Sequence, residues 1–316
     1  MAKAKPRLKL NSKLRALVKE FSDWWETSSK ALDAANAVRE PLYHYTDMAG
    51  LIGILDNRQL WFTHIQHLND PSELQFGARI AVEMLEDQAE RGNDAAKMFC
   101  DMAKRTLTLG SEVLGFYVAS FSRARDDLGQ WRAYGDNARG VSIGFAPKLF
   151  QIQYRTNLGL NEKTILAPVI YANRDDDHRD AIGRALEIAM RGVRDATSPE
   201  EGFEFFGELS TMLAVPIFSY SMSAKDPAYE NEREVRLLLS NDLDRLAPVL
   251  SSRARGSRLV PFIKSPLPVP LRQAIAGIVV GPAAGKLAKG AVQSLLRRHK
   301  ISPDIVEVSR IPYVAH

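Results

Sequence analysis

The sequence predicts an α+β fold with a mixed, mainly antiparallel sheet, flanking helices and a helical extension at the N-terminus. Apolar runs rich in β-branched and aromatic residues recur along the chain, as in Glu112–Ser122 and Ile275–Val280. Helical patterns lie between these runs without the regular strand–helix alternation that builds a doubly wound sheet. We find no internal repeat and no clear linker in the 316 residues. One domain with an N-terminal extension is therefore the simplest interpretation.

Residues 1–40 are expected to form a basic arm followed by an amphipathic helix. The first 19 residues carry seven Lys or Arg and no acid. After a cap at Ser12, apolar residues recur at helical spacing until about Ala35, and the stripe includes Trp24 and Trp25. We expect this face to pack on the main body or on a second subunit of a homo-oligomer. Residues 41–316 then form a single α+β domain.

The stretch from Pro41 to Leu74 is dense in polar and imidazole side chains. It predicts a strand at residues 42–46, a helix over 47–56 and an apolar run at 60–62. It closes on Asn69-Asp70-Pro71-Ser72-Glu73, which is typical of the start of a helix. Asp70 can cap the helix, Pro71 suits the first helical position, and the Glu73 carboxylate can reach back to cap a backbone amide. A segment that only packs needs fewer polar groups, so we interpret this stretch as one wall of a ligand site.

The remaining elements follow from apolar periodicity and turn residues. Helices are expected over residues 72–91, 93–109, 128–134, 175–194 and 284–300, and another from Phe203 to near Pro216. Strands are expected over residues 112–122, 141–145, 165–171, 258–262, 275–280 and 305–308, and from Glu234 onward.

Composition excludes several classes of protein. Charged residues make up 25% of the chain and hydrophobic residues 45%, which is typical of a soluble domain. The apolar run 274–280 is too short to cross a bilayer, and the N-terminus lacks the apolar core of a signal peptide. The single cysteine, Cys100, excludes an internal disulfide and a cysteine-based zinc cluster. A cytoplasmic location without membrane association is the expectation.

Basic residues are unevenly distributed, although the net charge is only +4. The stretch from Arg245 to Pro303 contains no Asp or Glu. Such an asymmetry is typical of a protein that meets a phosphate-rich partner such as a nucleic acid. A solvated basic face is the commoner origin of a charge run and stays open as the alternative.

Two pairs of residues at strand spacing are candidate ligand-binding groups. His44 and Thr46 lie two apart on a predicted strand and therefore share a face. Ser120 and Ser122 do the same at the end of another strand, where hydroxyls can bind a ligand or brace a carboxylate. The structural alternatives are a histidine bonded to backbone and ordinary serines at a strand end.

Two further groupings carry charge. Glu232 and Glu234 are expected to share a face at the start of an apolar strand, where mutual repulsion raises one pKa. Such a pair suits a site in which one carboxylate stabilises a cation and the other handles a proton; ion pairing with Arg236 is the alternative. Trp131 beside Arg132 could stack on a base or bind a phosphate. The alternative is that Trp131 packs in the core.

A metal-dependent hydrolase is a further alternative, since the opening stretch contains His64, His67, Asp70 and Glu73. The sequence shows no phosphate-binding loop of the required spacing, no dinucleotide fingerprint and no nucleophile elbow.

Several ordered motifs together resemble the bacterial domain-of-unknown-function family 2971. The resemblance covers about Leu42 to Tyr313 and leaves the N-terminal helix outside. Its motifs are LYHYT at 42–46, NDPSE at 69–73, SFS at 120–122, QWRAYGD at 130–136, GVSIGF at 140–145, KDP at 225–227, EREVR at 232–236, VGP at 280–282 and SRIPY at 309–313.

The order of these motifs is also similar to that of the ADP-ribosyltransferase superfamily. This resemblance implies a sheet core of that type and NAD as a substrate, without a metal. It implies that Glu234 and His44 are catalytic and that Glu232 orients the acceptor. Tyr43, Tyr45, Thr46, Ser120, Ser122, Trp131 and Arg132 would then line the nucleotide site.

We therefore expect an ADP-ribosyltransferase-like enzyme that cleaves the nicotinamide–ribose bond and transfers ADP-ribose to a nucleic acid or a protein. The reaction passes through an oxocarbenium-like state, as in glycoside cleavage, which a preorganised carboxylate stabilises. A defence or toxin effector is the setting that this chemistry fits. The alternative is a non-catalytic module that binds a nucleotide or a nucleic acid through its basic C-terminal half.

Overall fold

The computed structural model describes residues 9–35, 38–68, 73–151, 165–171, 175–242 and 249–313. The chain divides into two compact units, each assembled from three separate segments. The helical unit comprises residues 1–35, 69–114 and 172–225, and the sheet unit comprises residues 36–68, 115–171 and 226–316. The helix expected before residue 40 therefore groups with helices from the middle of the chain. The α+β class and the mainly antiparallel sheet are confirmed.

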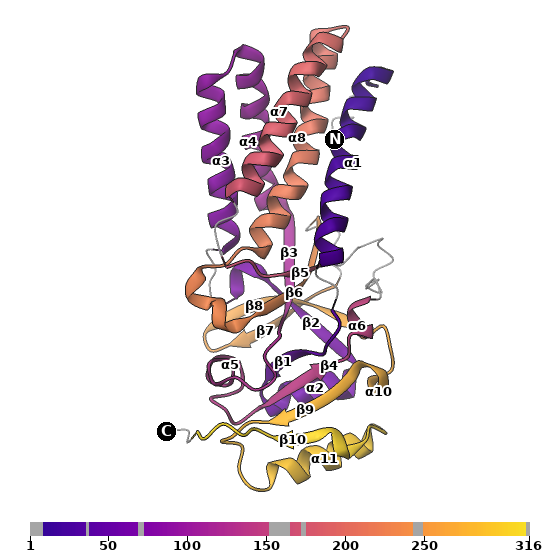
Figure 1. Ribbon diagram of the computed structural model, residues 1–316, viewed down its shortest axis with the longest axis vertical. Helices are drawn as coiled ribbons and strands as arrows, with labels where there is room; N and C mark the ends of the chain where they lie inside the picture. The colour runs from indigo at the N-terminus through magenta and orange to yellow at the C-terminus, as the bar shows by residue number, and fades with distance from the viewer. Residues whose placement is uncertain are drawn as a thin grey trace. The chain divides into compact units, whose positions relative to one another are not determined.

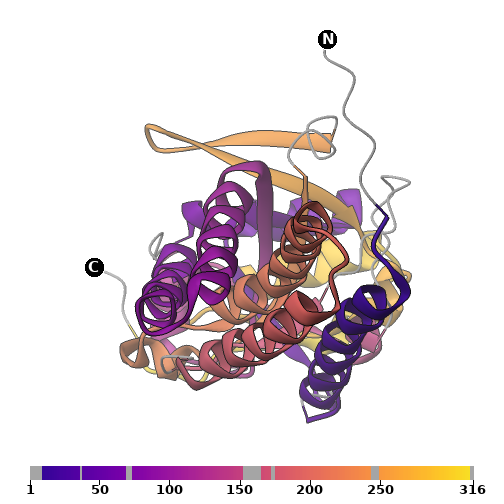
Figure 2. The same ribbon diagram turned by 90° about the horizontal axis from the view of Figure 1, so that it is seen from above.

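The helical unit is built from long helices that lie side by side in both ribbon views (Figures 1 and 2). Helix α8 contacts each of the others along the bundle. The buried stripe includes Leu14, Phe21, Phe99 and Phe206, and the last two rings pack at 5.5 Å. The helices are α1 (Ser12–Ala35), α3 (Glu73–Arg91), α4 (Asp94–Val113), α7 (Asp175–Asp195) and α8 (Pro199–Ser223).

Two helix ends in this unit differ from the sequence expectation. Helix α1 is capped by Asn11, not by Ser12, because the Asn11 Oδ1 atom accepts hydrogen bonds from the Lys13 and Leu14 amides. Helix α8 continues past Pro216 to Ser223. A proline removes one hydrogen bond from a helix, but Leu213 and Ile217, on either side of Pro216, are fully buried. Packing therefore outweighs the local signal.

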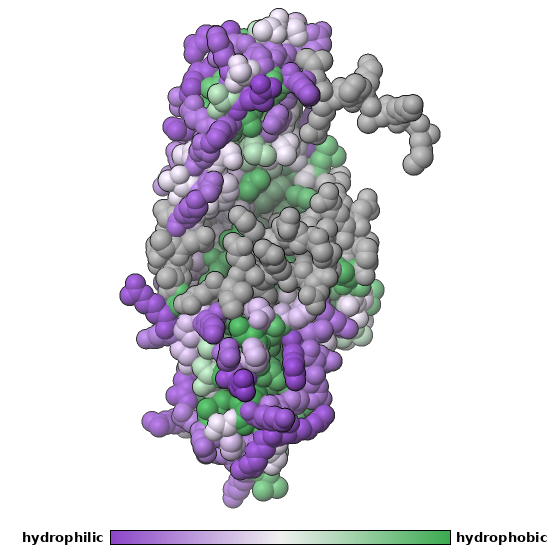
Figure 3. Space-filling view, turned by 90° about the vertical axis from the view of Figure 1, so that its right-hand side faces the viewer, coloured by the Kyte–Doolittle hydropathy of each residue, from purple (hydrophilic) through white to green (hydrophobic). Residues whose placement is uncertain are grey.

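The start of α8 is joined to the start of α1 by one buried carboxylate. Glu201 accepts hydrogen bonds from the Asn11 amide (2.7 Å), the Thr197 amide (2.8 Å) and the Thr197 hydroxyl (2.6 Å). The Thr197 bonds are the main cause that lowers the pKa of Glu201 to about 2. No helix in the described residues is long and apolar enough to span a membrane. Hydrophilic side chains cover most of the described helical surface in Figure 3.

The sheet unit contains ten strands among its described residues. The order is β10-β9-β4-β1-β3-β2-β8-β7, and β6 pairs with both β3 and β5. The β10–β9 pair is parallel, and the other pairs with a described register are antiparallel. The strands are β1 (Leu42–Thr46), β2 (Gln59–His64), β3 (Leu114–Ser122), β4 (Val141–Phe145), β5 (Ile165–Pro168), β6 (Glu234–Asp242), β7 (Leu250–Arg255), β8 (Arg258–Pro266), β9 (Ile275–Val280) and β10 (Val306–Val308).

One face of this sheet carries the larger apolar core. Residues of β1, β3, β4, β6 and β9 pack there against short helices. These helices are α2 (Met48–Asn57), α6 (Lys148–Gln151), α10 (Leu271–Ala274) and α11 (Ala288–Arg298). We call this the core face. The opposite face carries a smaller cluster around Tyr45 and Trp131, from α5 (Leu128–Tyr134).

Candidate functional site

Strand register assigns the predicted polar residues to two different faces of the sheet. Tyr43 lies opposite Ser122 of β3, and Tyr45 lies opposite Ser142 of β4. Directly opposed residues of an antiparallel pair project to the same side. We call this side, defined by Tyr43, Tyr45, Ser122 and Ser142, the polar face. Ser120 projects to it as well, because it lies two residues from Ser122 on β3.

His44 and Thr46 project to the core face, away from the two serines. His44 lies opposite Ile143, a core residue, and its ring is 5.9 Å from that of Phe121. Its Nδ1 atom is 3.0 Å from the Ser120 carbonyl oxygen. Because a carbonyl only accepts, Nδ1 must carry the proton. Burial is the main cause that lowers the pKa of His44. His44 therefore contacts the backbone of β3 from the core face. This is the structural alternative of a histidine that is hydrogen-bonded to backbone.

Ser122 connects the end of β3 to the segment that carries the two carboxylates. Its hydroxyl donates to the Glu232 carbonyl oxygen (2.6 Å) and accepts from the Ala124 amide (3.0 Å). The Arg123 amide donates to the Arg233 carbonyl oxygen (3.0 Å). The bonds to the Glu232 and Arg233 carbonyl oxygens join residues that are 110 positions apart in the chain, and they hold the Glu232 segment at the edge of the polar face.

Glu232 and Glu234 do not share a strand face, contrary to the sequence expectation. Glu232 ends the 3-10 helix η2 (Pro227–Glu232), and Arg233 then adopts a left-handed conformation with φ 46°. Only Glu234 belongs to β6. The turn at Arg233 breaks the two-residue alternation. The two carboxylates consequently have different surroundings.

The Glu232 side chain is half-buried and held by Tyr134. The Tyr134 hydroxyl donates to the Glu232 Oε1 atom at 2.9 Å. Tyr134 ends helix α5, whose first turn is capped by Asp127 through the Gln130 amide (2.9 Å). The carboxylate is thus oriented by a hydroxyl and partly open to solvent. This combination suits a group that meets a ligand.

Glu234 is buried and paired with a fully buried arginine. Its two carboxylate oxygens accept from the Arg236 Nε atom (2.8 Å) and Nη2 atom (2.9 Å). Val235 points into the core, so Glu234 and Arg236 point to the other side of β6. The Glu234 amide also donates to the Tyr171 hydroxyl (2.6 Å). A charge pair of this geometry orders the start of β6.

Tyr45 and Trp131 form the floor of the polar face. Their rings pack edge to face at 4.8 Å, and both side chains are buried. The Tyr45 hydroxyl donates to the Ala124 carbonyl oxygen (2.9 Å), and burial raises its pKa. The Trp131 Nε1 atom donates to Asp126 (2.7 Å). These rings therefore support the site. Tyr43 is half-buried, and Arg132 is exposed on α5.

A strained turn borders this floor. Asp136, Asn137 and Ala138 have φ values of 52°, 50° and 68°. These values lie in the left-handed region, which residues other than glycine seldom adopt. Gly140 follows, and a Cβ atom there would lie 2.1 Å from the Thr46 carbonyl oxygen. The Tyr313 hydroxyl donates to Asn137 (2.7 Å). Strain of this kind tends to gather at functional sites.

Sequence reasoning overlooked two residues of this region. Tyr134 lies inside a motif that drew attention for its tryptophan and arginine, so the signal was present. Asp126 gave little signal, because only the Trp131 indole is a nearby partner in the chain. Its other two partners, the Ser309 hydroxyl (2.7 Å) and the Arg310 amide (3.1 Å), are remote.

The residues proposed for a metal site are only partly described. The His64 and His67 rings are 5.8 Å apart. Asp70 lies outside the described residues, as does the side chain of Glu73. Within the described ranges, no group of three or more His, Cys, Asp or Glu is arranged to hold a metal ion.

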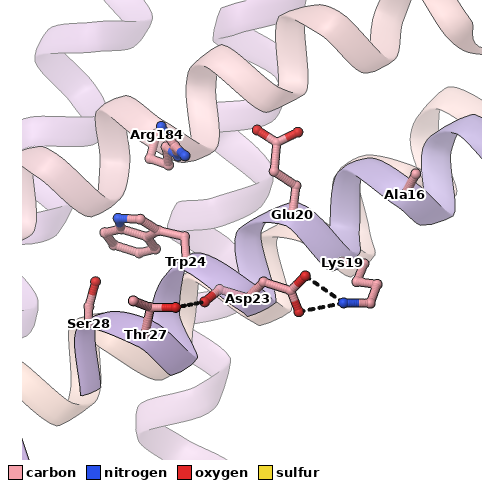
Figure 4. A pocket seen from close by; sticks show the side chains of 8 residues that line it. All are labelled: Ala16, Lys19, Glu20, Asp23, Trp24, Thr27, Ser28 and Arg184. Carbon is pink, nitrogen blue, oxygen red and sulfur yellow. Dashed lines mark hydrogen bonds and ion pairs between the residues drawn. The ribbon is translucent and has the colours of Figure 1, made fainter. Parts of the chain in front are cut away.

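A shallow pocket lies in the helical unit, on α1 and α7 (Figure 4). Lys19 pairs with Asp23 there, and Glu20 pairs with Arg191 at 2.8 Å. None of the predicted site residues lines it. Its lining residues are Ala16, Lys19, Glu20, Asp23, Trp24, Thr27, Ser28 and Arg184.

Comparison with known proteins finds a family model that matches the segment from α5 to β6. Residues 130–237 match the model of a family described as "Protein of unknown function (DUF2971)". The match is shorter than the span that the sequence motifs suggested. It begins in α5, ends in β6 and includes Trp131, Tyr134, Glu232, Glu234 and Arg236. No match to a curated protein and none to a solved structure was found.

Proposed function

We propose that the polar face binds NAD and cleaves its nicotinamide–ribose bond, as an ADP-ribosyltransferase-like enzyme would. The observation that carries this proposal is the half-buried Glu232 carboxylate, oriented by Tyr134 beside Ser122 on a rigid sheet. A fixed carboxylate at a partly dehydrated surface is the group that an oxocarbenium-like transition state requires.

Glu232 and Glu234 take different parts in this proposal. Glu234 is occupied by a bidentate bond to Arg236, so its role is to fix the start of β6. Glu232 is the carboxylate that can face the ribose. Ser120, Ser122 and Tyr43 would bind the nucleotide from the same face, and Arg132 could reach a phosphate from α5. His44 and Thr46 lie on the core face, so they would influence the site only indirectly, through the backbone of β3 and β1.

The reaction balances with these groups alone. The bond between the nicotinamide nitrogen and the ribose C1′ atom breaks, and its electron pair leaves with nicotinamide. The acceptor hydroxyl or amine attacks C1′, and its proton passes to the Glu232 carboxylate as general base. When water is the acceptor, the products are nicotinamide and ADP-ribose.

The test is to incubate the purified chain with NAD and to measure the release of free nicotinamide by chromatography. Glu232→Gln keeps the shape and removes the charge, so turnover should fall by about 10²-fold or more. Glu230→Gln is the matched control, because Glu230 is an exposed carboxylate in the same short helix. It should leave turnover unchanged.

Two outcomes would overturn the assignment. If the wild-type chain releases no nicotinamide when protein and nucleic-acid acceptors are supplied, the chain is not an NAD-cleaving enzyme. Equal turnover in Glu232→Gln and the wild type would remove Glu232 from the reaction. Tyr134→Phe gives a finer test, since it removes the 2.9 Å bond and leaves the carboxylate in place. It should lower turnover less than Glu232→Gln does.

A further inference from the structure

A patch of aromatic and basic side chains lies on β2, β8 and β7 of the sheet unit. It consists of Trp61, Arg253, Arg258, Phe262 and Lys264, which we call the stacking patch. Register places all five on one face: Trp61 lies opposite Lys264, and Thr63 opposite Phe262. On the neighbouring pair, Arg253 lies opposite Val260, which shares the side of Arg258 and Phe262 on β8.

The ring of Trp61 forms the centre of the stacking patch. Trp61 is 39% exposed, whereas Phe262 beneath it is 3% exposed. Their ring centroids are 4.3 Å apart and tilted by 31°. Phe262 thus holds Trp61 from the protein side, which leaves part of the indole exposed to solvent. Large aromatic rings are usually covered, so one presented in this way suggests a stacking ligand.

Cationic groups surround the two rings. The Arg253 guanidinium is 5.4 Å from the Trp61 centroid and 5.8 Å from that of Phe262. The Lys264 ammonium is 5.9 Å from the Phe262 centroid. Arg258 is exposed on the same face. The Arg253 Nη2 atom also donates to the Thr63 hydroxyl (3.3 Å). No Asp or Glu occurs in β2 or between residues 245 and 303.

The hairpin that carries these cations is at the border of the sheet. Strand β7 is last in the strand order, and a glycine turn with φ 60° at Gly256 joins it to β8. In Figure 2 the two long orange strands run beside each other at the edge of the sheet. An elongated ligand can therefore lie across the hairpin.

Single-stranded nucleic acid matches this chemistry better than other anions do. Its bases expose π faces that stack on aromatic side chains and on arginine, and its phosphates meet nearby cations. A duplex keeps its bases stacked internally and cannot use Trp61. An acidic peptide supplies charge without a ring to stack.

We propose that the stacking patch binds single-stranded nucleic acid, with a base on Trp61 and the backbone along Arg253, Arg258 and Lys264. The patch consists of residues of β2, β7 and β8, whereas Glu232 ends η2, and the proposal does not depend on the proposed reaction. A chain that fails to cleave NAD should still bind at this surface.

The experiment measures the anisotropy of a labelled single-stranded oligothymidylate, titrated with the full-length chain at several salt concentrations. Trp61→Ala should weaken binding by about tenfold and leave the salt dependence unchanged, because it removes stacking only. Trp61→Phe should keep most of the affinity. Arg253→Ala should weaken binding and reduce the slope of log K against log salt by about 0.7, the share of one phosphate contact.

The control is Lys289→Ala, which removes one exposed charge from the same acid-free stretch but from α11. It should leave affinity unchanged, and thermal melts check that each variant folds. Three results would overturn the proposal: no binding at low salt, equal competition by polyglutamate, or stronger binding of the matching duplex. An effect of Lys289→Ala as large as that of Arg253→Ala would also overturn it, since binding would then follow net charge alone.

Discussion

The helical unit and the sheet unit use their polar side chains in different ways. In the helical unit, a buried carboxylate joins helix ends: Glu201 satisfies amides that no helix can satisfy internally. In the sheet unit, Ser122, Tyr134 and the Glu234–Arg236 pair connect remote segments and leave one carboxylate half-open. The first arrangement secures packing, whereas the second builds a surface on which chemistry can occur.

This comparison predicts that the sheet unit is the more sensitive to loss of a polar group. Arg236→Met should destabilise it by about 3–5 kcal/mol, because the Glu234 carboxylate is left buried without its partner. Amide hydrogen exchange of peptides from β3 and β6 measures the loss, and peptides from α3 and α4 are the internal reference.

A double variant tests whether charge is the cause. Glu234→Leu with Arg236→Met replaces the pair by apolar side chains and should recover most of the stability. If Arg236→Met alone leaves exchange in β6 unchanged, the pair does not order that strand, and the contrast between the units fails.

The helical unit should instead be sensitive to added volume. A Cβ atom at Gly192 of α7 would lie 2.0 Å from the Phe205 ring of α8, and Phe205 has no exposed surface. Gly192→Ala should therefore destabilise the unit by about 1–3 kcal/mol through overpacking. Amide hydrogen exchange in α7 and α8 measures the loss of stability. The double variant Gly192→Ala with Phe205→Leu should recover part of that stability. An additive result would show that the two residues do not clash.

Much of the fold follows from short-range patterns. Strands β1, β4 and β9 and helix α5 have the bounds that the sequence predicts, because apolar runs bounded by turn residues fix both their type and their length. Strand β7 was missed: its sequence, LSSRAR, is polar, and it is a strand because it pairs with β8. The continuation of α8 past Pro216 likewise depends on tertiary packing.

The site was harder to predict than the fold. Alternation places His44 with Thr46, but only the pairing partners reveal which face they share, and that information lies in β4 and β3. For Glu232 and Glu234, alternation failed at Arg233, where nothing in the sequence signals a left-handed turn. Residues that act through remote partners therefore need the structure.

Acid should loosen the helical unit through Glu201. Its folded pKa is about 2, below the value of about 4.3 for an unfolded glutamate. The stabilisation is fully present above the unfolded pKa and is lost as pH falls toward 2. Exchange in α1 and α8 should increase over that range. Glu201→Gln should flatten the response, whereas Glu208→Gln, an exposed position on the same helix, should keep it.

The smallest effect concerns Gly183, which shares α7 with Gly192. A Cβ atom at Gly183 would meet nothing within 4 Å, and the residue is exposed. Glycine in a helix interior is less favourable than alanine by about 0.5–1 kcal/mol, because the unfolded glycine chain has more freedom to lose. Gly183→Ala should therefore stabilise α7 by about that amount, while the same substitution nine residues on destabilises it. Since backbone propensity is common to both sites, the difference between the two variants isolates the fit of α7 against Phe205. Two changes of the same sign and size would mean that the fit of α7 against Phe205 does not limit the stability of the helical unit.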